Sequence, residues 1–442
     1  MNKEARSGKV QRIAVIGAGI SGLASAWLLS RRHDVTLYEA ETRLGGHSNT
    51  VEADGVPVDT GFIVYNAPAY PNLTALFQHL NVPNQASDMS FSVSLDNGAL
   101  EYAGTDFAGL FAQKRNLLRP RFWSMLAQLL RFYRAAPRAA DLNDISLRDF
   151  LSAGGYSDAF LHDHLYPMIA AVWSCPAAEA GDLPAAAFIR FCENHGLLKI
   201  TGRPVWRTVT GGSREYVKRL RADFRGRVLR GMPVLGLRRI GMEDGGGVEL
   251  REASGSLVRY DHAVLACHAN QALQMLDDPS CAEREILGSF RYTSNLAVLH
   301  RDPSVMPRRR AAWAAWNFTG GRDEGAPVCV TYWMNRLQNL ETKSQLFVTL
   351  NPDREPQNIA MCQTYEHPVF DVGAMRAQAQ LWSLQGTQQT WFCGAYFGAG
   401  FHEDGLQAGL AVAEALGAPK RPWHVADESG RIQLPVLQSL AA

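Results

Sequence analysis

The first forty residues combine two patterns of hydrophobic positions, one of buried strands and one of a helix. A short apolar run, Arg12–Ile16, is followed by three glycines and then by a helix-like stretch at residues 23–29. A second strand-like run covers residues 34–38 and ends at Glu39. Short strands that are apolar on both faces are typical of a parallel sheet covered by helices. The pattern therefore predicts a βαβ unit near the N-terminus.

Other patterns occupy the middle of the chain. Residues 110–133 and 147–191 carry apolar positions at helical spacing, whereas residues 294–300 and 326–333 alternate apolar and polar side chains. Such alternation is typical of an antiparallel sheet with one face in the core. A chain of 442 residues is also too long for one simple core. Together these features predict an α/β protein with a Rossmann-type domain and a second, α+β domain.

The glycines between the first strand and the helix have the spacing of a dinucleotide-binding turn. Gly17 would make the tight turn, Gly19 would let the backbone approach a pyrophosphate, and Gly22 would let the helix pack closely on the strand. Glu39 follows Gly19 at the distance where an acid binds the adenosine ribose. The glycines alone are weak evidence, since they could cap a helix in another βαβ fold. The full order of strand, turn, helix, strand and acid is specific.

The segment after the second strand indicates which dinucleotide is bound. Residues 39–47 read Glu-Ala-Glu-Thr-Arg-Leu-Gly-Gly-His and resemble the E-x-x-x-R-x-G-G continuation of the amine-oxidase-like flavoprotein superfamily. The Asp-Thr-Gly at residues 59–61 matches the D-x-G turn of that superfamily. The resemblance implies an amine-oxidase-like fold and FAD as the cofactor, with Arg43 and the following glycine pair close to the pyrophosphate and the flavin.

The resemblance extends to the C-terminal part of the chain. Residues 391–405 resemble the closing segment of the superfamily, whose helix begins at the pyrimidine ring of the flavin. The positive end of a helix dipole would stabilise the negative charge that this ring gains on reduction. The motifs and the resemblance imply these cofactor-binding residues: Gly17, Gly19, Ser21, Gly22, Glu39, Arg43, Gly45, Gly46, His47, Val234, Gly394, Asp404, Gly405 and Leu406.

The dispersed motifs imply that the cofactor domain is discontinuous. The expected FAD-binding domain comprises residues 1–75, 205–290 and 385–420. The expected substrate domain comprises residues 76–204 and 291–384, and residues 421–442 form a C-terminal tail that wraps the surface. No second dinucleotide motif occurs. Oxygen, a quinone or the substrate itself must therefore complete the redox cycle.

The start of the last helix also carries the candidate catalytic residues, His402 and Glu403. A histidine beside a flavin can accept or donate a proton at neutral pH. The alternative is that the acids at this position only favour the positive end of the helix. True amine oxidases usually carry a lysine beside the flavin, and the equivalent stretch here, residues 291–298, contains none. This difference argues against amine oxidation.

Charge and composition limit the possible partners. The net charge is +1, so no overall field attracts nucleic acid. The seven cysteines are scattered and form no C-x-x-C pair, which argues against a disulfide framework or a zinc site and favours a reducing cytoplasm. No run of about 18 apolar residues occurs, and residues 13–29 lack a convincing signal-peptide cleavage site. We expect a cytoplasmic protein, soluble or peripheral on the inner face of the membrane.

One basic stretch, residues 107–140, contains no acid and has apolar positions at helical spacing. A helix with an apolar face and a cationic face suits an anionic bilayer surface. The alternative is a helix that packs on its own domain. The cations of the stretch are Lys114, Arg115, Arg119, Arg121, Arg131, Arg134 and Arg138.

A finer resemblance rests on residues 194–198, 209–214 and 394–405. They are similar to a bacterial group of predicted NAD/FAD-binding proteins, which is related to the flavoprotein domain fused ahead of some plant cyclopropane fatty acid synthases. The chain more distantly resembles carotenoid desaturases and flavin-dependent fatty-acid isomerases. These relations imply a lipid or other apolar substrate and a lipid-modifying enzyme as a possible partner. An amine or amino-acid oxidase, a redox-neutral double-bond isomerase and a non-catalytic flavoprotein stay open as alternatives.

Overall fold

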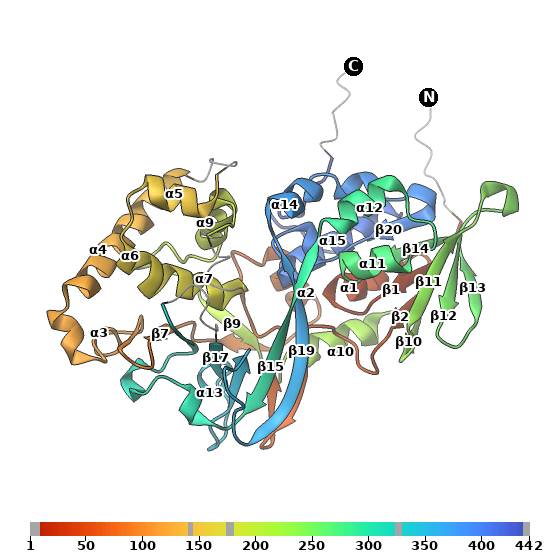
Figure 1. Ribbon diagram of the computed structural model, residues 1–442. Helices are drawn as coiled ribbons and strands as arrows, with labels where there is room; N and C mark the ends of the chain where they lie inside the picture. Colours follow the sequence, from red (N-terminus) through yellow and green to blue (C-terminus); the bar gives the residue numbers. More distant parts are fainter. Residues whose placement is uncertain (1–8, 140–144, 174–180, 323–328, 436–442) are drawn as a thin grey trace.

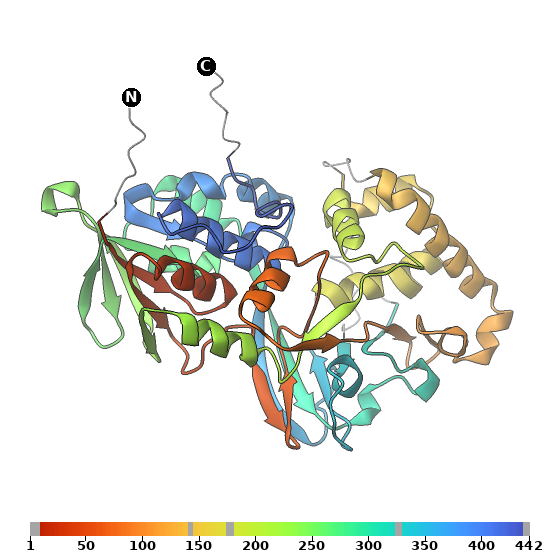
Figure 2. The ribbon, with the colours of Figure 1, turned by 180° about the vertical axis from the view of Figure 1, so that it is seen from behind.

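Five parallel strands form the central sheet of one lobe of the molecule (Figures 1 and 2). The computed structural model describes residues 9–139, 145–173, 181–322 and 329–435. The sheet draws its strands from separate stretches of the chain, and its parallel order confirms the predicted Rossmann-type fold class. From edge to edge its strands are β10 (Arg227–Arg230), β2 (Asp34–Glu39), β1 (Arg12–Ile16), β14 (His262–Leu265) and β20 (Thr390–Phe392).

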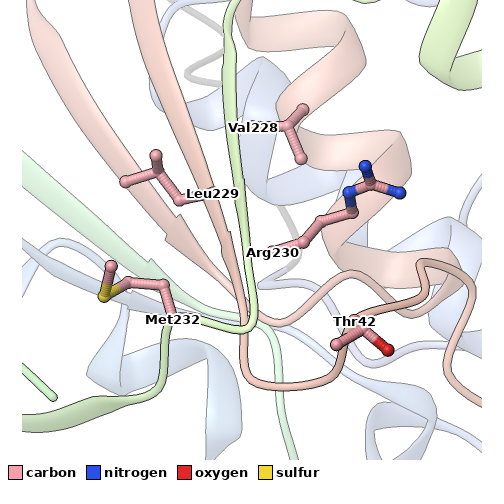
Figure 3. Close-up of a pocket in the computed structure, with 5 residues that line it drawn as sticks. All are labelled: Thr42, Val228, Leu229, Arg230 and Met232. Atoms are coloured by element: carbon pink, nitrogen blue, oxygen red, sulfur yellow. The ribbon is translucent and has the colours of Figure 1, made fainter.

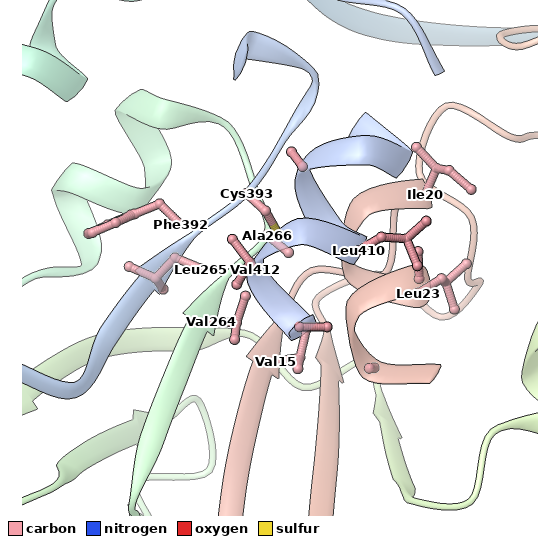
Figure 4. Close-up of a cluster of buried hydrophobic side chains, with 14 of the residues drawn as sticks. Val15, Ile20, Leu23, Val264, Leu265, Ala266, Phe392, Cys393, Leu410 and Val412 are labelled. Atoms are coloured by element: carbon pink, nitrogen blue, oxygen red, sulfur yellow. The ribbon is translucent and has the colours of Figure 1, made fainter. Parts of the chain in front are cut away.

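Two helices from opposite ends of the chain cover this sheet. They are α1 (Ile20–Leu29), all of whose residues are buried, and α15 (His402–Ala415). Figure 4 shows apolar side chains of both helices meeting those of the strands. A Cβ placed on Gly409 would lie only 2.2 Å from the carbonyl oxygen of Ser21, so the helices are as close as a glycine allows. This contact ties the C-terminal helix to the first helix of the chain.

The second lobe is built on a seven-stranded, mostly antiparallel sheet. The alternation at residues 294–300 correctly predicts a strand, and that at 326–333 does so for the part within the described residues. Two long strands of this sheet, β15 and β19, run up beside the first lobe (Figure 1). In order the strands are β19 (Ile359–Val369), β15 (Arg291–His300), β18 (Phe347–Leu350), β17 (Cys329–Trp333), β16 (Trp316–Gly320), β7 (Phe91–Leu95) and β8 (Leu100–Ala103).

Helices cover one side of the second lobe, as the helical spacing predicts. The apolar face of α4 contributes Phe122, Met125 and Phe132 to the interior. This packing agrees with the alternative of a helix that packs on its own domain, and membrane contact through residues 107–140 stays a prediction. Among the described residues, no helix is both long and apolar enough to cross a membrane. The helices that cover the second lobe are α3 (Phe107–Leu110), α4 (Pro120–Ala135), α5 (Leu147–Ala153), α6 (Asp158–Phe160), α7 (Tyr166–Trp173) and α9 (Ala185–Asn194).

Shorter elements complete the two lobes. The predicted hairpin before Asp59 is present as an antiparallel pair. The remaining strands are β3 (Thr50–Ala53), β4 (Val56–Asp59), β5 (Val64–Asn66), β6 (Asn84–Ala86), β9 (Trp206–Val209), β11 (Val234–Arg239), β12 (Val248–Glu252) and β13 (Leu257–Tyr260). The remaining α-helices are α2 (Pro71–His79), α10 (Arg214–Asp223), α11 (Ala269–Met275), α12 (Cys281–Gly288), α13 (Met334–Leu337) and α14 (Val372–Gln378).

The described part of the C-terminal tail is held to the first lobe by a few inward side chains, and the expectation that residues 421–442 wrap the surface stays a prediction. Within its described part, Arg421 and Ile432 are each only 5% exposed. Arg431 reaches inward, and its Nε lies 2.7 Å from Oδ1 of Asp404. A charge is costly to bury unless an opposite charge meets it. The tail therefore packs into the first lobe through this ion pair.

We predict that Gly409→Ala destabilises the protein, because the added methyl group collides with the backbone of α1. A forced separation of packed helices costs roughly 1–3 kcal/mol of the free energy of unfolding. Chemical denaturation measures the loss. The matched control is Gly288→Ala in α12, where the nearest atom to the new Cβ is 3.8 Å away. Equal stability of Gly409→Ala and the wild type would contradict the tight packing.

Candidate functional site

The glycine turn after β1 forms an open cradle at the start of α1. Gly17 has a φ of +102°, and a Cβ on it would lie 2.6 Å from the carbonyl oxygen of Ala266, so the tight turn requires glycine. No heavy atom lies within 4 Å of a Cβ placed on Gly19. No side chain caps α1, so its first N–H groups are available to an anion. A pyrophosphate fits this space and these donors.

A second glycine loop lies directly beside the cradle. The N–H of Gly45 donates to the carbonyl oxygen of Ala18 at 2.9 Å, and a Cβ on Gly46 would lie 3.1 Å from Cα of Gly19. Arg43 donates from Nη1 to the carbonyl oxygen of Gly46 at 2.7 Å, which holds its guanidinium at the loop. The structure thus brings together the two glycine motifs and the arginine that the sequence identifies.

Glu39 lies at the other end of the cradle, where β2 ends. Its Oε2 accepts from the N–H of Ala18 at 2.8 Å and its Oε1 from the N–H of Glu41 at 2.9 Å. A hollow of about 450 Å³ opens on the neighbouring edge of the sheet (Figure 3). There the backbone of Arg230 in β10 lies beside that of Glu39 in β2. This hollow leaves room for the ribose and adenine of a dinucleotide. The hollow is lined by Thr42, Val228, Leu229, Arg230 and Met232.

The other predicted cofactor contacts lie further inside the lobe. Ser21 and Leu406 are 5% and 0% exposed, so protein atoms cover their side chains at the contact of α1 with α15. Gly394 follows β20 and lies against the carbonyl oxygen of Cys267, which a Cβ would approach to 3.4 Å. Val234 is 9% exposed and belongs to the hydrophobic core. The contacts of these four residues and of Gly405 with FAD stay predictions.

His402 begins α15 and packs tightly against the loop after Gly46. Its Nε2 lies 2.9 Å from both Ser48 Oγ and Tyr216 Oη, and its ring stacks on Phe62 with 3.8 Å between centroids. Burial lowers the pKa of His402 to about 3. The ring is therefore neutral at physiological pH, in contrast to the expectation of a side chain that titrates there. Its catalytic role stays a prediction.

The two acids after His402 have structural roles. Glu403 accepts from the N–H groups of Asn72 and Leu73 at 3.0 and 2.9 Å, so it caps the neighbouring helix α2. Asp404 accepts from the N–H of Phe401 at 2.7 Å and caps its own helix. The capping alternative is thus the one that the hydrogen bonds support. The hydrogen bonds of both carboxylate oxygens to α2 give Glu403 a structural role, and its catalytic role stays a prediction.

A cluster of three histidines lies on the other side of the cofactor loop. The ring centroid of His47 is 6.3 Å from that of His268 and 5.4 Å from that of His367. Burial lowers the pKa of each ring, and neighbouring imidazoles lower it further for His47 and His367, for the latter to about 4. Sequence reasoning identifies His47 alone. His268 has a signal that could have found it, since it follows a parallel strand at its carboxyl end.

The β15–β19 pair positions His367. Asn295 on β15 lies opposite Tyr365 on β19, and its Nδ2 is 2.9 Å from Nδ1 of His367. The amide orientation is set by Asn351, whose Nδ2 donates to the Oδ1 of Asn295 at 2.7 Å. Nδ1 of His367 is therefore an acceptor, and the proton of the neutral ring is on Nε2. His268 is held separately by Glu366, at 3.1 Å.

No lysine takes part in this cluster. All of the lysines within the described ranges are exposed at the surface. The stretch at 291–298, where amine oxidases usually carry their lysine, lies in β15 and presents Asn295 to the cluster instead. The described lysines are Lys9, Lys114, Lys199, Lys218, Lys343 and Lys420.

Known proteins share this architecture. The family model for flavin-containing amine oxidoreductases matches residues 20–336. A Mycobacterium tuberculosis protein described as a flavin-containing monoamine oxidase is 29% identical over 339 residues, covering 72% of this chain and 70% of that protein. The solved structure of a fatty acid isomerase from P. acnes, which produces CLA, superimposes with a TM-score of 0.66 at 15% identity, over 92% and 98% of the two chains. Cyclohexylamine oxidase from Brevibacterium oxydans superimposes with a TM-score of 0.64 at 16% identity, over 92% and 100%.

We predict that Gly19→Val abolishes FAD binding without unfolding the protein, because the new side chain fills the open cradle and collides with no protein atom. The visible flavin absorbance of the purified variant measures the loss. Gly104→Val is the matched control, since a Cβ there is 3.8 Å from its nearest neighbour and far from the cradle. Full flavin occupancy in Gly19→Val would overturn the site assignment.

The histidine cluster also predicts a pH dependence of stability. A folded-state pKa below the unfolded value of 6.5 means that the unfolded chain binds more protons at acidic pH. The free energy of unfolding should therefore fall as the pH drops from 6.5 toward 4. His367 alone accounts for about 2 kcal/mol of this loss. His367→Gln should reduce the slope, measured by denaturation at several pH values, whereas His424→Gln, at a fully exposed side chain, should not.

Proposed function

The chain belongs to the family of flavin-containing amine oxidoreductases, and we propose that this FAD-dependent oxidoreductase acts on an apolar substrate, a lipid acyl chain or a similar molecule. The observation that carries the proposal is that Asn295 and His367, and none of the described lysines, lie beside the cofactor loop. The fold itself does not decide between substrates, because an isomerase of fatty acids and an oxidase of amines superimpose on the chain about equally well.

Neutral side chains surround the cofactor loop and suit a substrate without charge. His47, His367 and His402 all have pKa values held below neutrality by burial. Glu366 is the acid that contacts this cluster, and it is paired with His268. The buried neutral imidazoles offer a cationic amine no counter-ion of their own, whereas they accept an acyl chain at little cost.

The residues themselves can supply proton transfer. When bound, FAD supplies a flavin ring that accepts a hydride at N5 and can return it. We assign the proton to His367, because its Nε2 carries the hydrogen while Asn295 holds Nδ1. To deliver this proton to a substrate carbon, the ring would take up a proton from solvent at Nδ1 in place of the Asn295 hydrogen bond, so that it passes through an imidazolium and returns to a neutral ring. His402, held between Ser48 and Tyr216, is the second candidate for this role.

A redox-neutral isomerase is the second function that a specific observation favours. No second dinucleotide motif occurs in the sequence, so no nicotinamide site is evident for an external electron donor. A hydride that is taken and returned within one turnover needs none. The sequence resemblance to the flavoprotein domain of plant cyclopropane fatty acid synthases agrees with an acyl substrate in either case. It also makes a lipid-modifying enzyme a reasonable partner.

The test is an anaerobic mixing experiment with the flavin-loaded protein and phospholipid or fatty acid chains. We expect lipid to bleach the flavin absorbance if the reaction is a net oxidation, and mass spectrometry to show a loss of two hydrogens. An isomerase would instead give a product of unchanged mass with a shifted double bond. Amines added in the same way should leave the flavin oxidised.

Variants of His367 test whether the reaction takes place at this site. His367→Phe should lower the rate of flavin reduction or of isomerisation at least tenfold while the flavin content stays constant, because the proton carrier is lost. His424→Phe is the matched control at an exposed position. Rapid bleaching by amines, with none by lipid, would replace the proposal with amine oxidation. A flavin that no compound of either class reduces, with no lipid product formed, would indicate a non-catalytic flavoprotein.

A further inference from the structure

The tip of the helical lobe formed by α3, η1 (Lys114–Leu118) and the start of α4 carries an unusual apolar surface. Leu118 is 87% exposed and Phe107 73%, whereas Trp123 is 48% and Leu117 44% exposed. None of these side chains belongs to the buried face of α4, which packs into the core. Large apolar side chains in one exposed group mark an interaction surface.

The four side chains belong to one continuous patch. The ring of Phe107 lies 4.7 Å from that of Phe111, which lies 5.8 Å from that of Trp123. Trp123 in turn donates from Nε1 to the carbonyl oxygen of Leu117 at 2.9 Å, next to Leu118. We call this group, Phe107, Leu117, Leu118 and Trp123, the apolar tip. It occupies the far left end of the molecule in Figure 1.

Positive charge borders the apolar tip. Lys114 and Arg115 are exposed within η1, between the apolar residues. Arg119 follows and donates to the carbonyl oxygen of Ala99 at 2.9 Å and to amide oxygens. No carboxylate in the described ranges pairs with these three cations. Asp106, an acid near α3, caps that helix by accepting from the N–H of Gly109 at 2.7 Å.

A hollow of about 500 Å³ opens beside Arg119, and carboxylates line it together with arginines. Arg121 and Arg322 both donate to Asp163, and each also pairs with a second acid, Asp158 and Asp96 respectively. Arg119 instead donates to neutral oxygens, and burial followed by the neighbouring arginines lowers its pKa. Its guanidinium therefore adds to the charge of Lys114 and Arg115, and such a group favours a phosphate partner.

We propose that the apolar tip and its basic border dock the protein on a membrane surface of anionic phospholipid. Leu117, Leu118, Phe107 and Trp123 would enter the interface, where aromatic rings and leucines are stable. Lys114, Arg115 and Arg119 would face the headgroups. The proposal is independent of the reaction that the flavin site performs, because it uses none of the residues of that site.

The experiment is sedimentation of the flavin-loaded full chain with vesicles of phosphatidylcholine, with and without phosphatidylglycerol. We expect binding to the anionic vesicles, weakened by salt, and little binding to phosphatidylcholine alone. Leu117→Gln with Leu118→Gln should reduce the partition coefficient at least tenfold. Lys114→Gln with Arg115→Gln should reduce it roughly 25-fold, since each cation near an anionic surface accounts for about a fivefold change.

Two control variants lie at the opposite end of the molecule. Met242→Gln with Leu257→Gln alters side chains that are 76% and 62% exposed, and Arg225→Gln with Arg227→Gln removes the same charge as the basic variant. Both should bind like the wild type. Absence of wild-type binding to anionic vesicles would overturn the proposal. Equal binding to neutral vesicles, or equal effects of the tip and control variants, would also overturn it. Retained flavin absorbance shows that every variant is folded.

Discussion

The contact of α1 with α15 over the parallel sheet is the constraint on which the rest of the structure depends. Glycine at 409 lets the backbones of two helices from opposite ends of the chain meet directly. The contact holds the start of α1, with its open cradle at Gly19, close to the start of α15, with His402. Because both helices also rest on the sheet, the N-termini that serve a dinucleotide cannot move independently. Cofactor binding and stability therefore share one core.

The same core explains why the polar groups of the site are neutral. His47, His367 and His402 are enclosed by packed elements of both lobes, and a charge on any of them would lose its hydration. Hydrogen bonds from Asn295, Ser48 and Tyr216 orient the rings without adding charge. The site thus combines oriented hydrogen-bonding groups with neutral imidazole rings.

Glu403 and Asp404, the two acids at the start of α15, connect this helix to other parts of the first lobe. Glu403 joins α15 to α2, and Asp404 joins α15 to the C-terminal tail through Arg431. Each carboxylate meets N–H donors or a guanidinium, as a buried charge requires. The helical lobe shows a different case, because the apolar face of α4 is inside while large apolar side chains are exposed where α3, η1 and α4 meet.

The sequence by itself determined the parts of the site that are local. The turn at Gly17, the cradle at Gly19 and the acid at the end of β2 depend on backbone conformation over a few dozen residues. Their spacing can therefore be recognised in the sequence. It also determined the fold class, because the strand and helix patterns follow from which faces are buried. Only the tertiary structure brought His268 and His367 to His47 and turned Glu403 away to α2. Those contacts join residues that are hundreds of positions apart, and no periodicity encodes a distance between separate elements. The physical reason is that such a contact is set by how whole helices and sheets pack.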